Sequence, residues 1–238
     1  MRIYRPGIWY LNPYLNDSNP TNISQGNSHL DSEKSHSFNL SYSNFTQKFN
    51  INLSARYSFT NNSIEQVTEQ VKDTEIEGLQ NPTGKEVLYS TYQNIGKSRN
   101  ASLSGYVNWN ATSNTRIYAN LYGNYTYMEG ANGLKNDGWN LFAYGGAQQS
   151  LPHDWRISLN IYGQTPWIML QGKGSSFFDY GLSVNKSFLN KRLTLSAFAS
   201  NFFKKYTSPT SSIEGVGFTQ DSWNRYTRQR FGVSVSYR

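Results

Sequence analysis

Three histidines are the residues most suited to metal binding or acid–base chemistry, because the chain has no cysteine. His29, His36 and His153 do not have the short spacing that places two imidazoles on one zinc ion. Gly172-Lys173-Gly174-Ser175 lacks the remaining residues of a phosphate-binding loop, and no Gly-x-Ser-x-Gly nucleophile elbow occurs. We therefore predict no metal site, no cofactor and no covalent catalysis.

One catalytic arrangement stays open. His29 or His36 could approach Asp31 or Ser35 and form a base–carboxylate or base–hydroxyl pair. These residues also fit a solvated loop, since they lie in a segment rich in serine and asparagine. We favour the loop interpretation, and so predict that the protein is not an enzyme and has no catalytic residue.

The composition favours β-structure. Charged residues make up 16% of the chain and aromatic residues 16%, with a mean hydropathy of −0.67, whereas soluble domains carry about 25% charged residues. Strong helix formers are scarce. The longest apolar cluster, Trp167-Ile168-Met169-Leu170, is far shorter than the roughly 18 residues of a membrane-spanning helix. These features exclude an all-helical fold and a helical membrane protein.

The net charge of +7 does not indicate nucleic-acid binding. Such binding needs Lys and Arg gathered into a patch, but here they are scattered. Two small groups come close together in sequence, Lys204-Lys205 and Arg225/Arg228/Arg230. We predict no nucleic-acid partner.

Strict alternation of apolar and polar residues dominates the chain. Residues 49–59 place Phe, Ile, Leu, Ala, Tyr and Phe on one parity and Asn, Asn, Ser, Arg and Ser on the other, which predicts a strand. Similar patterns predict nine strands, around residues 38–42, 49–59, 101–109, 117–127, 141–149, 155–161, 178–184, 193–199 and 231–237, and a tenth around Arg2–Tyr10.

The connections between the strands alternate in length. Residues 44–48, 110–115, 151–154 and 189–191 are short turns, whereas residues 13–35, 61–86, 129–137, 165–176 and 206–221 form mostly longer polar loops. In an up-and-down sheet, all the short turns then lie at one end. Outer-membrane barrels have this asymmetry, with short periplasmic turns and longer extracellular loops.

Aromatic residues on the apolar parity gather near the two strand ends, as in the girdles of membrane barrels. Aliphatic residues fill the middle. The predicted girdle residues are Phe49, Trp109, Trp155 and Tyr237 beside the short turns, and Tyr57, Phe59, Tyr125, Tyr127, Phe178 and Tyr180 toward the long loops.

The opposite parity is polar along the whole strand, which predicts a face that borders water or a plug inside a wide barrel. An Arg on the lipid face costs about 2–4 kcal/mol at the bilayer midplane, and the charges fit this rule. The predicted lumen-facing charges are Arg56, Arg116, Arg156, Asp179 and Arg230.

Gly26–Ser35 resembles the Gly-Asn-Pro-x-Leu-x-Pro-Glu-x-Ser segment of TonB-dependent outer-membrane receptors, with Ser28 and Ser32 in place of the two prolines. Arg5–Pro13 and the closing Phe231–Arg238 are similar to the outer-membrane β-barrel subgroup of that family. The resemblance implies an antiparallel transmembrane β-barrel of about 22 strands. Residues 1–238 would be its C-terminal part: 1–35 a strand end plus an extracellular loop, and 36–238 about nine strands. A signal peptide and a plug domain would lie outside this sequence.

The resemblance also implies nutrient uptake across the outer membrane of a Gram-negative bacterium. The implied partners are outer-membrane lipid, a TonB-type inner-membrane protein that acts through the plug, a surface lipoprotein lid, and a small-molecule, glycan or peptide ligand. Two alternatives stay open: a self-contained ten-stranded outer-membrane barrel that acts as a protease, lipase or adhesin, and a soluble β-sandwich binding module.

Overall fold

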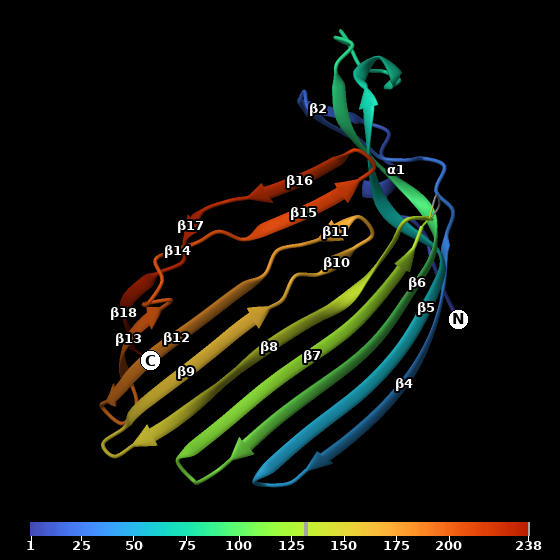
Figure 1. The fold of residues 1–238 in the computed structure, drawn as a ribbon. Helices are drawn as coiled ribbons and strands as arrows, with labels where there is room; N and C mark the ends of the chain where they lie inside the picture. The colour runs from blue at the N-terminus through green and yellow to red at the C-terminus, as the bar shows by residue number, and fades with distance from the viewer. Residues whose placement is uncertain (131–132, 238) are drawn as a thin grey trace.

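A curved antiparallel sheet forms most of the molecule in this computed structural model, which describes residues 1–130 and 133–237 (Figure 1). Ten strands follow one another across the sheet in sequence order, each antiparallel to the next. The predicted all-β meander of about ten strands is confirmed. Its strands are β1 (Arg2–Tyr4), β4 (Glu33–Phe45), β5 (Phe49–Lys72), β6 (Glu86–Asn110), β7 (Thr115–Glu129), β8 (Lys135–Leu151), β9 (Trp155–Gln164), β12 (Phe177–Phe188), β13 (Leu193–Ser200) and β18 (Arg230–Tyr237).

The short turns lie together at one end of the sheet, as predicted (Figure 1). The backbone of His153 and Asp154 between β8 and β9 has positive φ angles of 61° and 59°, and that of Leu189, Asn190 and Lys191 between β12 and β13 has 53°, 55° and 69°. Left-handed residues match the twist of tightly connected antiparallel strands. Local turn geometry therefore sets the register of these hairpins.

The long connections lie at the other end, but much of their backbone is folded into strands. β5 and β6 stay paired up to Lys72↔Glu86, so their hairpin rises beyond the sheet (Figure 1). The residue at the base of this extension, Asn62, has a φ of 62° and no register partner across the ladder. The expectation of a loop over residues 61–86 is wrong for residues 61–72, which continue β5, whereas residues 73–85 connect the two strands as expected. Its tip carries the 3-10 turn η1 (Asp73–Glu75).

Three further long connections also contain strands. Between β1 and β4, β2 (Leu15–Asn19) pairs with β3 (Asn22–Gln25), and β3 runs parallel to β6. Between β9 and β12, β10 (Ile168–Met169) pairs with β11 (Gly172–Lys173). The chain between β13 and β18 supplies β14 (Tyr206–Thr207), β15 (Thr210–Gly215), β16 (Phe218–Trp223) and β17 (Tyr226–Thr227). The predicted 129–137 loop includes residues 131–132, which lie outside the described residues.

These added strands build a second region at the end of the sheet that carries the long connections, and we call this region the crown (Figure 1). It comprises residues 5–32, residues 62–96 of the β5–β6 hairpin, and residues 165–176 and 201–229. β11 pairs with β15 and β15 with β16, and this sheet reaches from the β13–β18 side to the raised part of β5 and β6 (Figure 1). The remaining parts of the ten strands are called the wall.

A buried pairing between residues far apart in sequence holds the crown together. The Gln171 side-chain Oε1 accepts a hydrogen bond from the Thr68 backbone N–H at 2.6 Å, and its Nε2 donates to the Thr68 carbonyl at 2.8 Å. The Leu170 side chain packs beside this pairing against Val67 and Ile95. The Gln171 amide thereby satisfies two backbone groups that would otherwise be buried without partners.

The N-terminal segment differs from its prediction. The strand expected over Arg2–Tyr10 ends at Tyr4, and a helical turn, α1, occupies Ile8–Leu11. Pro6 has no N–H to donate to a ladder, so a strand is not expected to continue through it.

No helix among the described residues is long and apolar enough to cross a membrane. The expectation about the closing segment includes Arg238, which also lies outside them.

Candidate functional site

The registers give the wall one apolar and one polar face. Residues directly opposite each other on paired strands share a face. The row Trp109, Ile117, Ala147, Leu159, Leu182, Ala199 and Phe231 runs across seven strands on one face. The row Asn108, Tyr118, Gly146, Asn160, Gly181, Ser200 and Arg230 runs across the other.

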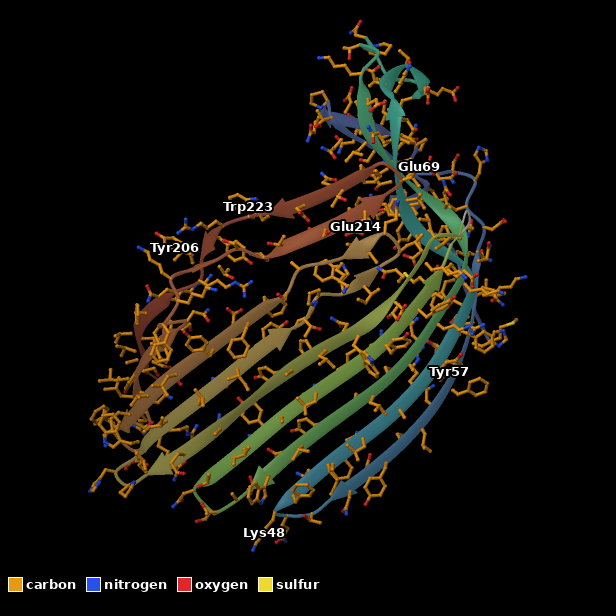
Figure 2. The ribbon with its side chains drawn as sticks, viewed as in Figure 1. Lys48, Tyr57, Glu69, Tyr206, Glu214 and Trp223 are labelled. Atoms are coloured by element: carbon orange, nitrogen blue, oxygen red, sulfur yellow. The ribbon has the colours of Figure 1, made fainter. Side chains whose placement is uncertain are left out.

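Large side chains on the apolar face are exposed. Leu40 is 75% exposed, Leu103 62% and Val233 78%. A contiguous apolar surface of this extent marks contact with a membrane or another protein. The structure places every predicted girdle residue on this face by register, and the labelled Tyr57 projects outward from β5 (Figure 2). That these rings lie at lipid headgroups stays a prediction.

The apolar face also carries aromatic contacts that the sequence patterns missed. The Tyr125 ring lies 5.5 Å from the ring of Trp139 on β8. The rings of Phe178 and Tyr180 are 6.0 Å apart, and the Tyr180 hydroxyl accepts a hydrogen bond from the Phe203 backbone N–H at 2.8 Å. Trp139 lies opposite Tyr125 and so shares the apolar face of the predicted girdle. The alternation of apolar and polar residues could therefore have identified it as a further girdle residue.

The five predicted lumen-facing charges all lie on the polar face by register, but they are not gathered in one site. The Arg116 Nε donates to Asn108 Oδ1 at 2.6 Å and its guanidinium lies 5.7 Å from the Tyr118 ring. Arg56 and Arg156 lie on other strands. Asp179 and Arg230 alone share a cavity.

This cavity is the candidate functional site. It has a volume of about 570 Å³ and lies between the outer parts of β9, β12 and β13 and the segment before β18. Asp179 forms an ion pair with Arg228 and accepts a hydrogen bond from Asn201 Nδ2 at 2.7 Å. The Arg228 Nη2 donates to the Tyr226 hydroxyl at 2.7 Å. Asp179 and Tyr226 thereby hold the guanidinium in place, and a ligand would meet a fixed donor group.

Aromatic rings surround this ion pair. The Arg228 guanidinium lies 5.3 Å from the Phe177 ring centre and 5.1 Å from that of Tyr226, which is within cation–π range. Asn201 is buried and has a φ of 50°, and its Oδ1 accepts from the Tyr180 backbone N–H at 3.2 Å. The crowding of Arg225, Arg228 and Arg230 in the sequence was the signal for Arg228. No alternation pattern identified Asn201 or Tyr226.

The polar face carries an aromatic band that contradicts the prediction of a polar surface along the whole strand. Ring centres of Tyr118 and Tyr144 are 5.8 Å apart, those of Tyr144 and Tyr162 are 6.3 Å apart, and those of Tyr162 and Phe177 are 4.8 Å apart. The Tyr118 ring lies over Gly146, where an added Cβ would come 2.7 Å from the tyrosine hydroxyl. The glycine makes room for the ring, so these rings form a continuous band that leads to the candidate site.

Among the hydrogen bonds of the described residues, none joins the side chain of His29 or His36 to Asp31 or Ser35. The His36 ring stacks on Phe59 with a centre distance of 4.9 Å, on the face opposite to Ser35, since adjacent strand residues alternate. Asn94, not a histidine, contacts the Asp31 backbone, with its Oδ1 accepting from the Asp31 N–H at 2.8 Å. Among the described residues, no cluster of three potential metal ligands is present.

Comparison with known proteins agrees with this architecture. A search of curated proteins found no match. Among solved structures, the chain is similar to the copper transporter OprC, with 14% identity and a TM-score of 0.63 over 99% of this chain and 36% of that chain. At this identity the likeness shows the fold alone, and this chain spans little more than a third of that protein. The sequence pattern of the outer membrane protein beta-barrel family matches residues 1–237. The chain belongs to the outer membrane protein beta-barrel family.

Proposed function

We propose that the chain is the C-terminal wall and crown of a TonB-dependent receptor that takes up a scarce nutrient across the outer membrane of a Gram-negative bacterium. The observation that carries the proposal is the pairing of an open ten-stranded wall with a folded crown and an Arg-lined cavity on the polar face. In this proposal further strands, outside the given sequence, close the barrel, because unpaired strand edges are not tolerated in lipid.

The polar face supplies ligand-binding groups. The Arg228–Asp179 pair, Arg230 and the rings of Tyr162 and Phe177 line one cavity. Guanidinium groups bind carboxylate or phosphate oxygens, and aromatic rings stack on flat groups. Such a site fits a small metal chelate, a glycan or a peptide with an acidic group. It calls for binding and release, with no covalent step.

The remaining partners belong to the same proposal. A plug would fill the barrel and transmit the pull of a TonB-type inner-membrane protein. Exposed crown side chains such as Trp9 (84% exposed) and Trp223 (65%) offer apolar contacts for a surface lipoprotein lid. The labelled Trp223 lies at the C-terminal end of β16, where the chain turns back toward β17 (Figure 2).

Uptake by cells tests the proposal. A strain that lacks the protein would be grown on limiting ferric chelates, copper, oligosaccharides or peptides, and complemented with the protein at its natural full length. We expect at least one nutrient to require the protein and an energised inner membrane. Arg228→Gln/Arg230→Gln should reduce that growth, whereas Lys48→Gln/Lys191→Gln, in the short turns, should not.

A passive pore would contradict the proposal. If the purified full-length protein conducts solutes through planar bilayers, and nutrient uptake does not depend on the energised membrane, the chain belongs to a porin-like barrel. Heat-modifiable mobility of the isolated 238-residue chain would favour the alternative of a self-contained barrel.

A further inference from the structure

Two cations interrupt the apolar face of the wall at its outer rim. Arg99 lies opposite Phe59 on β5 and Tyr127 on β7, and Lys97 lies opposite Asn61 and Glu129. Both cations therefore share the face of the predicted girdle. The five predicted lumen-facing charges lie on the polar face of the wall, whereas Lys97 and Arg99 lie on its apolar face.

Aromatic side chains frame the two cations. The Tyr57 and Phe59 rings are 6.4 Å apart, and with Lys97, Ser98 and Arg99 they line a cavity of about 420 Å³ that also includes Thr60 and Asn61. Tyr57 projects outward beside this cavity (Figure 2). The frame is built from two adjacent strands that are paired without a break up to Asn61↔Lys97.

No carboxylate of the described chain forms an ion pair with either cation. The ion pairs found among residues 1–130 and 133–237 are Lys135–Glu129, at 3.4 Å, and Arg228–Asp179. Glu129 faces Lys97 but is held by Lys135. Lys97 and Arg99 are both exposed, so their donors are free to bind an anion.

An apolar groove lies directly below the cations on the same face. It has a volume of about 500 Å³, and Leu103 and Gly105 of β6 lie in its floor, with leucines of β4, β5 and β7 around them. Gly105 leaves space beside Leu53, whose Cδ2 would lie 3.2 Å from an added Cβ. Gly105 comes six positions after Arg99, which corresponds to about 20 Å along β6. This spacing suits a headgroup above and acyl chains below.

We propose that Lys97, Arg99, Tyr57 and Phe59 bind the phosphorylated headgroup of an outer-leaflet glycolipid, with an acyl chain in the groove along Leu103 and Gly105. The family places the chain in the outer membrane, and the long connections place this rim at the extracellular side. Arg binds phosphate through two parallel donors and Lys through a point charge. The bound lipid would anchor the wall on its convex side, independently of what the barrel transports.

Lipid binding to the full-length protein tests this site. Native mass spectrometry in detergent would be used to titrate diphosphoryl lipid A against the natural protein, Lys97→Gln/Arg99→Gln, and the control Lys48→Gln/Lys191→Gln. The control removes the same charge at the opposite end. Because each cation at a membrane surface contributes about 1 kcal/mol, we expect the rim variant to bind about thirtyfold more weakly and the control to be unchanged. Arg99→Lys keeps the charge but loses the paired donors, so its affinity should lie between that of the natural protein and that of the rim variant.

Two further arms identify the source of the phosphate. Dephosphorylated lipid A should bind the natural protein as weakly as diphosphoryl lipid A binds the rim variant, and inorganic phosphate at the same concentration should not displace the lipid. Equal lipid binding by the natural protein and the rim variant, or an equal loss in the control, would overturn the proposal. Displacement by inorganic phosphate would assign the site to the free anion instead. Heat-modifiable mobility checks that each variant is folded.

Discussion

The wall and the crown bury apolar residues in opposite ways. The eight buried apolar side chains among the described residues all lie in the crown: Ile23, Leu30, Val67, Ile76, Val87, Ile95, Ile168 and Leu170. The wall has none, although it carries most of the large exposed apolar side chains. The crown therefore folds around internal cores, as proteins do in water, whereas the wall needs an apolar solvent on one face.

This difference explains how one chain is both hydrophilic on average and a membrane protein. Between the two open edges of the wall the backbone groups are paired in the ladders, and we expect the outward side chains to meet lipid. In the crown, hydrophobic burial and buried hydrogen bonds such as Gln171 to Thr68 replace lipid contact. Mutations should therefore have different consequences in the two regions.

The largest effect is expected from a cavity in the crown. Leu170→Ala should destabilise the packing of the β10–β11 hairpin on Val67 and Ile95 by about 2–5 kcal/mol, because a buried leucine is removed. Hydrogen exchange at residues 64–72 and 88–96 should become faster, while the wall keeps its protection. The control Leu103→Ala removes an exposed wall leucine whose space lipid can fill. Equal effects of the two substitutions would contradict the separation of the regions.

A charge on the apolar face of the wall is expected to have the next largest effect. Leu121 lies at the middle of β7, and Leu121→Arg should cost about 2–4 kcal/mol in the membrane-inserted protein. Asn120→Arg adds the same charge one residue away on the polar face and should have little effect. Urea titration of the full-length protein folded into lipid vesicles measures both. A larger cost for Asn120→Arg would reverse the assignment of the faces.

A smaller effect is expected at the tip of the crown. The Asp73 carboxylate accepts hydrogen bonds from the Thr83 backbone N–H at 2.6 Å, the Thr83 hydroxyl at 2.7 Å and the Gly84 N–H at 2.7 Å. The backbone hydrogen bond from Thr83 is the main cause that lowers the Asp73 pKa. The stability from the ionised carboxylate is therefore present above the unfolded pKa of about 3.9 and is lost as the pH falls through the lower folded value.

Hydrogen exchange at Thr83 and Gly84, corrected for intrinsic rates, measures this dependence. In the natural protein, protection should persist at pH 5 and fall below pH 4, whereas Asp73→Asn should lack it already at pH 5. Glu75→Gln, at an exposed neighbouring position, should behave as the natural protein. Protection in Asp73→Asn that matches the natural protein at pH 5 would contradict the role of the carboxylate.

The wall could be predicted from the sequence, and the crown could not. Period-2 alternation is local, so Phe49–Phe59 shows both its strand and its faces without any knowledge of its partners. The crown depends on pairs such as Thr68 and Gln171, which are 103 residues apart, and short strands such as β10 and β11 have no period to detect. In the candidate site, Asp179 and Arg230 follow strand parity, but Arg228, Asn201 and Tyr226 are brought in by a connection.

The aromatic band on the polar face shows a second limit. Tyr118, Tyr144 and Tyr162 have the polar parity and were visible in the sequence, but alternation assigns a face and not the contacts on it. The rings come into contact because of the cross-strand register and the space left by Gly146. The pairing of the strands determines both the register and the position of this space, and alternation along a single strand does not reveal the pairing.

The central claim is that lipid-facing and water-facing side chains alternate along the strands of the wall. Spin-label accessibility on β7 tests this claim most directly. Single cysteines would replace Ala119, Asn120, Leu121 and Tyr122 in turn, in the full-length protein without other cysteines, and carry a nitroxide in outer-membrane lipid. We predict that labels at 119 and 121 collide mainly with oxygen dissolved in the bilayer, and labels at 120 and 122 mainly with a water-soluble nickel chelate. Equal accessibility at all four positions, or the reverse alternation, would contradict the account.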